Sequence, residues 1–478
     1  MGAMASSAKI QLMGLLLIFY NQMVGLPGPV VSLALSIALL FDAVWDPIIG
    51  QLSDGTRTPW GRRHPYIYGG AIPVSVCFAF LFLPPVGWPP RALFFYLLVM
   101  IVLVRALDSV HEIPSTALTP ELATGYDERT GLLSYRYFFT TFGRAMAAVL
   151  GFGVFLHATK AESLGQLNRA GYGPYAISVA AISLVAVLAS GIATHRYIPF
   201  LHQPRRRRAT FGMLAREIGT TLSNRNFVAI SVSAVIFGIT LGLAGGLMIY
   251  FYTYFWDLPA KSLLWLSLWA IPAGFLGVAV APAWARMWGK KTACLIVFFI
   301  AIFATVIPIG GRLIGIVPPN GSPFVLPILI LDTMASGCLG TMGFVIVASM
   351  LADVVEETEL KTGRRSEGLL FAAESLLRKA STGFAALLPG LLLGVVRFPA
   401  HARPGHMSPA IMTHLALIYL PLTTALMLAS TSALFFYKID RGRHEDNLKA
   451  LANAAALVEA FDPQLEISEG PGIVTRPT

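Results

Sequence analysis

Charge is scarce in this sequence. Asp, Glu, Lys and Arg make up 13% of its 478 residues, whereas a typical soluble domain has about 25%. So few charges cannot cover the surface of a soluble protein of this size, and hydrophobic residues supply 55% of the chain. The composition therefore excludes an ordinary soluble protein and predicts one that crosses a membrane several times.

Cysteine and strand-like alternation are scarce too. The three cysteines, Cys77, Cys294 and Cys338, lie in apolar segments and lack the spacing of metal ligands, which argues against a disulfide framework or a cysteine metal site. No run alternates apolar and polar residues as the strands of an outer-membrane barrel do. Apolar runs of about 20 residues recur instead, and each can cross roughly 30 Å of hydrocarbon as a helix. We expect an all-α membrane protein.

Twelve such apolar segments divide the chain into two groups of six. We place the transmembrane helices at 8–27, 30–50, 66–84, 92–118, 131–157 and 173–194, then at 226–256, 262–284, 292–316, 323–350, 367–396 and 410–437. The expected domains are an N-terminal six-helix bundle at 1–197, a cytoplasmic basic linker at 198–225, a C-terminal six-helix bundle at 226–438 and a partly disordered cytoplasmic tail at 439–478.

The net charge of +10 does not indicate a nucleic-acid partner, because Lys and Arg gather in alternate loops. One set of loops contains the arginine run 205–208 and the opposite set carries little positive charge. Positive charge marks the cytoplasmic side, so we expect both termini in the cytoplasm and the chain in the inner membrane. The first apolar segment is span-length and lacks a small-residue cleavage site, so no cleavable signal peptide is expected.

The two halves resemble each other. "LIFYNQMVGLP" ends the first predicted helix and "IYFYTYFWDLP" ends the seventh, while "PWGRRHP" follows the second helix and "MWGKKTA" the eighth. The two displacements, about 232 and about 228 residues, are nearly equal, which indicates a duplicated six-helix unit. We expect two pseudo-symmetric bundles that rock around a central site.

The stretch "FDAVWDP" places Asp42 and Asp46 one helical turn apart inside an apolar segment. Both carboxylates project from one helix face and repel each other, and each costs roughly 2.5 to 3.5 kcal/mol at membrane depth without a partner. A bound cation would offset these costs, either sodium held by several oxygens or a proton on one carboxylate. The alternative is a salt bridge to Lys or Arg on a neighbouring helix, and a coupling-ion site can use that bridge when empty.

Polar stripes also mark the fourth and fifth predicted helices. Such stripes must face protein or water. Glu112 and Arg136 either pair across the two helices or hydrogen-bond a polar solute, since a carboxylate and a guanidinium fork suit sugar hydroxyls. The members at helical spacing are Arg105, Ser109 and Glu112 in the fourth helix, and Arg136, Thr140 and Arg144 in the fifth.

The eleventh predicted helix, "GLLFAAESLLRKASTGFAALLPG", carries Glu374, Arg378 and Lys379. A lysine at this depth needs a carboxylate partner. The candidates are Asp42 and Asp46, and such a contact would couple the second half of the protein to cation occupancy in the first.

Three stretches together resemble a known family. They are "DAVWDPIIGQLSDGTRTPWGRRHPYI", "EIPSTALTPELATGYDERTGLLSYRYF" and "MLADVVEETELKTGRRSEGLLFAAESLLRK". Their residues and order are similar to those of the glycoside/pentoside/hexuronide cation symporters, the melibiose permease-like group of the major facilitator superfamily. The resemblance spans nearly the whole chain and implies the fold of that superfamily, with twelve transmembrane helices in two bundles.

The resemblance also implies roles for individual residues. The family's cation site would fall at Asp42 and Asp46, with Ser109 in place of its threonine and Trp45 in place of its asparagine. The family's sugar-binding carboxylate, arginine and stacking tryptophan fall at Glu112, Arg136 and Thr116. Its lysine on the eleventh helix falls at Lys379, or at Arg378 if the register slips by one, and its helix-one aspartate falls near Ser6.

Two departures from the family bear on what is bound. Trp45 removes an oxygen ligand, which favours a proton over sodium. Thr116 removes an aromatic stacking surface, so a galactoside is not assigned. Aromatic side chains that could line the cavity instead are Tyr20, beside Phe19, and Tyr252, between Tyr250 and Tyr254; interfacial belts or helix packing are the alternative roles for these residues.

The loop "LSDGTRTPWGRRHP" resembles the cytoplasmic gate of the superfamily. Asp54, Arg62 and Arg63 are expected to make charged contacts to neighbouring helix ends in an outward-open state. Such contacts modulate the conformational equilibrium and do not bind solute.

The sequence therefore predicts a secondary active transporter, not an enzyme, that couples symport of a glycoside or related polar solute to Na⁺ or H⁺. We expect no cofactor beyond the coupling ion, a monomer, and partners limited to the solute and the bilayer. Two alternatives remain: a lysolipid or amphiphile carrier of the same fold, and a membrane sensor that binds a ligand without moving it.

Overall fold

The computed structural model describes residues 1–122, 126–160, 162–200, 224–362, 367–404, 407–439 and residue 442. Nearly all of the expected basic linker and C-terminal tail lies outside these residues. Within them, twelve helical segments are long and apolar enough to cross a membrane. This number confirms the sequence prediction.

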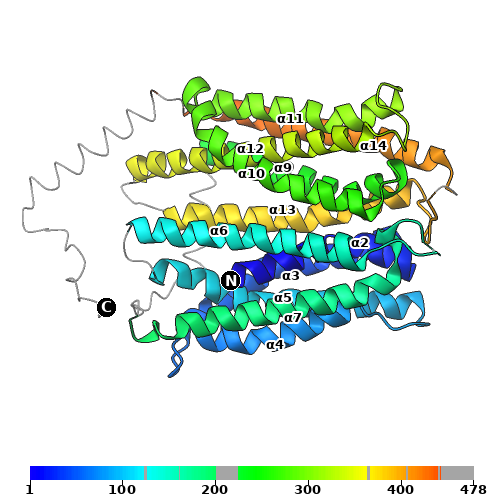
Figure 1. Ribbon diagram of the computed structural model, residues 1–478. Coiled ribbons are helices and arrows are strands. Elements are labelled where there is room, and N and C mark those ends of the chain that lie inside the picture. Colours follow the sequence, from blue (N-terminus) through cyan, green and yellow to red (C-terminus); the bar gives the residue numbers. More distant parts are fainter. Residues whose placement is uncertain are drawn as a thin grey trace, which may run out of the picture.

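Each half of the chain supplies six of these segments (Figure 1). The first half contains α1 (Gly2–Met13), α2 (Leu16–Ile18) with the π-helix η1 (Phe19–Val24), α3 (Gly28–Gly55), α4 (His64–Leu81), α5 (Pro90–Leu122), α6 (Tyr126–Ala148) with the π-helix η2 (Val149–Phe155), the short η3 (Gly165–Leu167), α7 (Arg169–His195) and the short η4 (Ile198–Phe200). The second half contains α9 (Arg225–Tyr250) with the π-helix η5 (Phe251–Phe255), α10 (Ala260–Trp288), α11 (Lys290–Leu313), α12 (Val325–Thr362), α13 (Glu367–Val395) and α14 (Pro409–Ala433) with the short η6 (Leu434–Phe436).

The largest departure from the expected boundaries is at α12. The apolar run predicts an end near residue 350, but the helix continues to Thr362. The added segment, "LADVVEETELKT", is polar yet rich in good helix formers such as Ala, Glu, Leu and Lys. Hydropathy therefore predicts where the membrane-spanning part of α12 ends, whereas the helix itself continues beyond that point because its residues favour helix.

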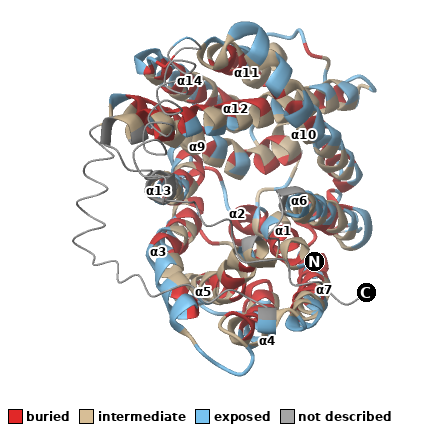
Figure 2. Ribbon diagram, turned by 90° about the vertical axis from the view of Figure 1, so that its left-hand side faces the viewer, coloured by how far each residue is buried: buried red, intermediate tan, exposed pale blue. Residues whose placement is uncertain are grey.

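The helices form two bundles that meet along two seams. Within the first bundle α1 packs on α6 and α7, and α4 packs on α5 and α7; within the second, α12 packs on α10 and α11, and α9 packs on α13 and α14. Between the bundles, α3 lies against α13 and α6 lies against α10 (Figure 2). The predicted two-bundle architecture is therefore present.

Backbone details repeat between the halves. The two segments paired in the sequence, which end the first and seventh spans, both finish in a π-helical turn, η1 and η5. The two loops paired in the sequence both turn at a glycine with φ of 75°, Gly61 and Gly289. In each loop the basic residues that follow reach an acid near the end of a later helix of the same bundle: Arg63 Nη2 lies 2.8 Å from Glu121 Oε1, and Lys290 Nζ lies 2.5 Å from Asp353 Oδ1. The duplication predicted from short sequence matches thus extends to conformation and ion pairing.

The bundles are joined at one end of the molecule and separate at the other. We call the end that contains η1 and η5 the closed end, and the end that contains the 56–63 loop the basic end. One apolar core cluster draws on both halves and includes Tyr20, Leu26 and Tyr250 near the closed end. Toward the basic end each half has its own cluster, represented by Ile67 in the first and Val354 in the second. The view onto the basic end in Figure 2 shows the two groups of helices on either side of the centre.

Candidate functional site

Both aspartates of α3 are paired with cationic side chains on other helices. Asp42 forms an ion pair with Arg105 of α5, and Asp46 forms one with Lys379 of α13, across the seam between the bundles. Each carboxylate uses Oδ2 for its cationic partner, while Oδ1 is buried and has no hydrogen-bond partner. The salt-bridge alternative raised from the sequence is thus present, and it leaves two buried carboxylate oxygens available.

Trp45 lies between the two aspartates in sequence and supplies no oxygen. Its indole Nε1 donates to the carbonyl oxygen of Ala106 at 3.1 Å, and its ring stacks on Phe41 with centroids 5.5 Å apart. The hydroxyl of Ser109, a buried residue, donates to the carbonyl of Arg105 at 3.1 Å. In the described part of the chain no group of three or more His, Cys, Asp or Glu side chains could hold a metal ion. Na⁺ binding at Asp42 and Asp46 stays a prediction.

A buried cluster beside this pair was missed from the sequence. Lys9 of α1, whose side chain is 1% exposed, forms an ion pair with Asp108 of α5. The Nδ1 atom of His111 lies 3.5 Å from Asp108 Oδ1. The sequence did contain a signal for this cluster, because Lys9 is the one basic residue inside the first predicted helix. The resemblance placed a charged helix-one position near Ser6, whereas the charge on this helix lies at Lys9.

Glu112 and Arg136 do not pair with each other in the described structure. The Arg136 guanidinium donates instead to the hydroxyls of Thr116, at 2.6 Å, and Thr119, at 3.4 Å. Glu112 is acted on by the charges of Asp108, Lys9, Arg136 and Arg105. The direct ion pair considered from the sequence is therefore absent, and Glu112 lies near both positively and negatively charged side chains.

A cavity of about 730 Å³ lies between the bundles, and we call it the central cavity. Tyr252 lines it, as expected, whereas Glu112, Arg136 and Thr116 do not. Thr140 and Arg144, from the polar stripe of the fifth predicted helix, line it as well. The polar side chains around the cavity are Gln11, Tyr137, Thr140, Thr141 and Arg144 of the first bundle and Tyr252, Ser267, Thr333 and Thr341 of the second.

The prediction that Tyr20 lines the cavity is wrong. Its side chain is fully buried, and its hydroxyl donates to the carbonyl oxygen of Leu81 at 2.7 Å. Phe19 packs edge-on against it with ring centroids 5.3 Å apart. A buried tyrosine needs a partner for its hydroxyl, and the end of α4 supplies one inside the first bundle. Tyr20 is a packing residue here, which was the alternative.

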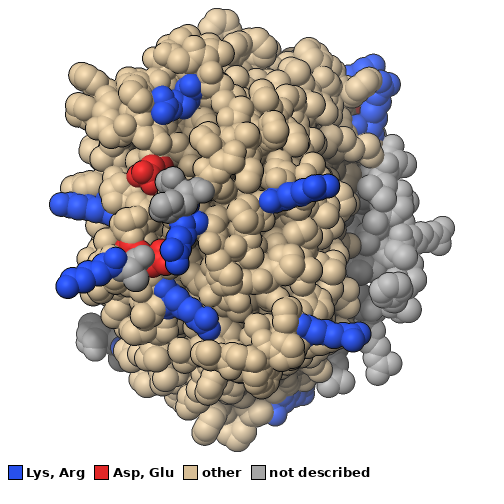
Figure 3. Space-filling view, turned by 90° about the vertical axis from the view of Figure 1, so that its right-hand side faces the viewer, with Lys and Arg blue, Asp and Glu red and all other residues tan. Residues whose placement is uncertain are grey.

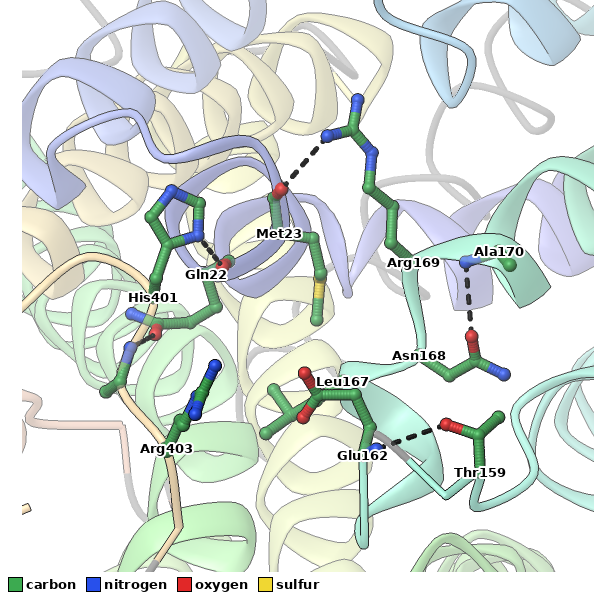
Figure 4. Close-up of a pocket in the computed structure, with 11 residues that line it drawn as sticks. Gln22, Met23, Thr159, Glu162, Leu167, Asn168, Arg169, Ala170, His401 and Arg403 are labelled. Atoms are coloured by element: carbon green, nitrogen blue, oxygen red, sulfur yellow. Dashed lines mark hydrogen bonds between the residues drawn. The ribbon is translucent and has the colours of Figure 1, made fainter. Parts of the chain in front are cut away.

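Hydrogen bonds that join η1 to the end of α9 and to η5 hold the closed end together. Tyr250 donates to Asn21 Oδ1 at 3.0 Å, and Tyr254 donates to Gln22 Oε1 at 3.1 Å. The loop after α13 adds His401, whose Nδ1 lies 2.8 Å from the carbonyl oxygen of Gln22 (Figure 4). A cavity of about 460 Å³ opens beside these contacts. Individual Lys and Arg side chains are scattered over the surrounding face, most of which is uncharged (Figure 3).

Comparison with known proteins identifies the family. A family profile described as MFS/sugar transport protein matches residues 1–441. The chain belongs to this family. It is a transporter, not an enzyme, and the resemblance seen in its sequence is confirmed.

Individual relatives and structures agree with this assignment. The chain is 26% identical to an uncharacterized symporter of Synechocystis, over 90% of this chain and 91% of the relative. It is 26% identical to the isoprimeverose transporter of Lactiplantibacillus pentosus, over 89% of this chain and 84% of the relative. Its fold resembles that of a bacterial homologue of the human lysosomal transporter Spinster, with a TM-score of 0.63, 16% identity, and coverage of 94% of this chain and 97% of that one.

The expected gate residues of this transporter contact helix ends of their own bundle. Arg62 and Arg63 both reach Glu121 near the end of α5, and Asp54 near the end of α3 lies 3.4 Å from Arg63 Nη2 and 3.8 Å from Arg62 Nη1. Burial lowers the pKa of Arg63. The predicted charged contacts are present; among the described residues they link the 56–63 loop to α3 and α5, in a structure whose bundles are joined at the opposite end.

Arg378 and Glu374 face away from the aspartate pair. Arg378 Nε lies 3.6 Å from Glu374 Oε1 one turn earlier on α13. Both residues line a second cavity of about 510 Å³ between α9, α12 and α13, whose other walls are largely apolar. Lys379 rather than Arg378 therefore contacts the aspartate pair, through Asp46, and the coupling role expected of Arg378 and Glu374 stays a prediction.

Proposed function

We propose that this transporter is a symporter that carries a glycoside or related polar solute together with a cation bound at Asp42 and Asp46. The observation that carries the proposal is the ion pair between Asp46 and Lys379, which joins the two bundles, together with the unpartnered Oδ1 atom on each aspartate. A cation that neutralises the carboxylates competes with Lys379 and Arg105 for them. Cation binding would then loosen one contact between the bundles.

We propose a proton as the coupling ion. Sodium requires several oxygen ligands, and the indole of Trp45 offers only a donor, already used by Ala106. The oxygens that the family resemblance assigns to this site are those of the two carboxylates and the hydroxyl of Ser109, which donates to the carbonyl of Arg105. A proton needs only one carboxylate oxygen, and Oδ1 of either aspartate can take it.

The solute site would be the central cavity. Arg144 and Thr140 on one wall and Tyr252 and Thr333 on the other supply donors and acceptors for sugar hydroxyls. The isoprimeverose transporter among its relatives supports a glycoside as solute. With one charge moving down 100 mV, about 2.3 kcal/mol is available, enough for roughly fiftyfold accumulation.

We propose that the basic end faces the cytoplasm. The arginine run 205–208 and the loop with Arg62 and Arg63 belong to the set of loops that carries most of the positive charge. Both termini would then be cytoplasmic in the inner membrane, and the structure would represent a state closed toward the outside. The transporter would act as a monomer.

An amphiphile carrier is the second candidate. The observation in its favour is the second cavity, whose largely apolar walls include Phe237, Leu241 and Phe344 with one ion pair at its edge. Such a lining suits an acyl chain beside a polar headgroup.

One experiment separates these candidates. Purified transporter in proteoliposomes is given labelled isoprimeverose, lactose or a lysophospholipid, with an imposed proton gradient, an imposed sodium gradient or neither. The proposal expects accumulation of a sugar with the proton gradient only. Sugar uptake driven by the sodium gradient would show that sodium, not a proton, is the coupling ion. Uptake of the lysophospholipid would favour the second candidate. Sugar uptake that does not depend on either gradient would rule out coupling to these ions.

A further inference from the structure

An additional acid lies inside the membrane span of α12. Asp332 is seven residues after the start of this helix at Val325, which places it about 10 Å along the helix at 1.5 Å per residue. The residues immediately before it, "PILIL", are apolar. Its carboxyl group therefore lies at hydrocarbon depth rather than at the helix end.

Asp332 has no cationic partner among the described residues. Other membrane-depth acids do: Asp42 has Arg105, Asp46 has Lys379, and Asp108 has Lys9. Asp353, farther along α12, has Lys290. Glu112 of α5 forms no ion pair in the described structure either, but it lies among the cationic groups of Lys9, Arg136 and Arg105. Asp332 differs in having no cationic group near it among the described residues, whereas an ionised carboxylate at this depth normally pairs with a cation or faces water.

The groups around Asp332 are polar but uncharged. Ser336 of the same helix lies beside the carboxyl group, Tyr252 approaches from η5, and Tyr419 approaches from α14. Of the other helices that contact α12, α9, α10 and α11 carry Lys and Arg only near their ends. On α13, Arg378 pairs with Glu374 and Lys379 pairs with Asp46. At the closed end, Arg312 of α11 lies next to Asn320, with Nη2 3.5 Å from Oδ1.

Two observations connect this group to the transport pathway. Thr333, the next residue, and Tyr252 both line the central cavity, so water in the cavity comes close to the carboxyl group. Tyr419 is fully buried and its hydroxyl has no hydrogen-bond partner. A buried, unpartnered hydroxyl beside an unpaired carboxyl group marks a polar site with unused hydrogen-bonding capacity.

We propose that Asp332 is a proton-binding site of the second bundle, separate from the aspartate pair of the first. It is a neutral carboxylic acid in this arrangement and exchanges its proton with water in the central cavity. The pH on the side to which the cavity opens therefore sets its protonation. Ser336, Tyr252 and Tyr419 are its polar neighbours and supply no charge.

Infrared difference spectroscopy tests this without a transported solute. The full-length protein in lipid is stepped between mildly acidic and mildly alkaline buffer, and the carbonyl stretch of protonated carboxyl groups is recorded. Asp332→Asn is compared with Asp257→Asn, which alters an exposed loop acid, and with Asp46→Asn. We expect a wild-type band that disappears in D332N and persists in D257N and D46N.

A wild-type band that persists unchanged in D332N would overturn the proposal, as would the absence of any such band in the wild type. Folding is checked by the thermal midpoint, because the amide matches the shape of the neutral acid and is expected to leave the midpoint unchanged or raised. A Tyr419→Phe variant provides a second test: its band is expected at a shifted frequency, and an unshifted band would remove Tyr419 from the site. Failure at Asp332 would leave the aspartate pair untouched, since D46N is measured separately.

Discussion

Lys379 of α13 and Asp46 of α3 form an ion pair across the seam between the two bundles. Lys379 is 30% exposed at its side chain and Asp46 13%, so the pair is only partly shielded from water. The relationship links a charge in the first half of the chain to one in the second. Any cation that occupies Asp46 therefore changes a contact between the bundles.

Removal of Lys379 alone should destabilise the protein, because Asp46 is left at membrane depth without its partner. We expect Lys379→Met to lower the free energy of unfolding, and the double variant with Asp46→Asn to recover part of the loss. The coupling free energy of the pair should be about 1 to 3 kcal/mol, measured by thermal unfolding of the four proteins. Arg378→Met is the matched control, since its side chain is 53% exposed. Purely additive effects would mean that the pair contributes nothing.

The buried pair of Lys9 and Asp108 should be more sensitive. Breaking a buried ion pair by removing one partner costs about 3 to 5 kcal/mol, whereas removing both can be nearly neutral. We expect Lys9→Met to lower the thermal midpoint sharply and Lys9→Met with Asp108→Asn to restore most of it. If the double variant were as unstable as the single one, Lys9 would have a role other than neutralising Asp108.

The closed end should open when its hydrogen bonds are removed. Tyr254→Phe deletes the donor to Gln22, and a net hydrogen bond contributes about 1 kcal/mol, or about a fivefold change in population. A cysteine introduced at Ser267 in the central cavity reports opening through its reaction with an impermeant thiol reagent applied to that side. We expect faster labelling in Tyr254→Phe. Tyr137→Phe, which lies away from the closed end, is the control and should leave the rate unchanged.

Restoring an oxygen at position 45 should make the site responsive to sodium. Trp45→Asn supplies a side-chain carbonyl next to the aspartates, whereas Trp45→Phe changes size without adding an oxygen. Sodium that binds only the folded protein raises its stability with concentration. We expect NaCl, compared with choline chloride, to raise the thermal midpoint of Trp45→Asn only. A sodium shift already present in the wild type would contradict a proton-only site.

Sequence patterns predicted much of this molecule because hydropathy and repetition are local signals. Apolar length defined the twelve spans, and two short matches revealed the duplication that places η1 against η5. The contact of Lys379 with the aspartates followed from charge balance at membrane depth, since few acids were available as partners.

Other features depend on helix orientation, which periodicity does not fix. Tyr20 and Tyr252 occupy similar positions in the two repeats, yet Tyr20 turns into the first bundle and Tyr252 toward the central cavity. Likewise, Arg136 shares a stripe with Arg144, but Arg136 is drawn to Thr116 while Arg144 lines the cavity. The partner of a polar or charged side chain depends on how the helices pack in three dimensions, and this cannot be predicted from the periodicity of a single sequence.

The most direct test concerns Asp46 as holder of the coupling ion. Proteoliposomes with wild type or Asp46→Asn are compared, with the sugar that the uptake screen identifies, for exchange between equal concentrations and for accumulation against a gradient. The amide cannot take up and release a proton in this range, so we predict that the variant still exchanges sugar but no longer accumulates it. Accumulation by Asp46→Asn equal to that of the wild type would contradict the account.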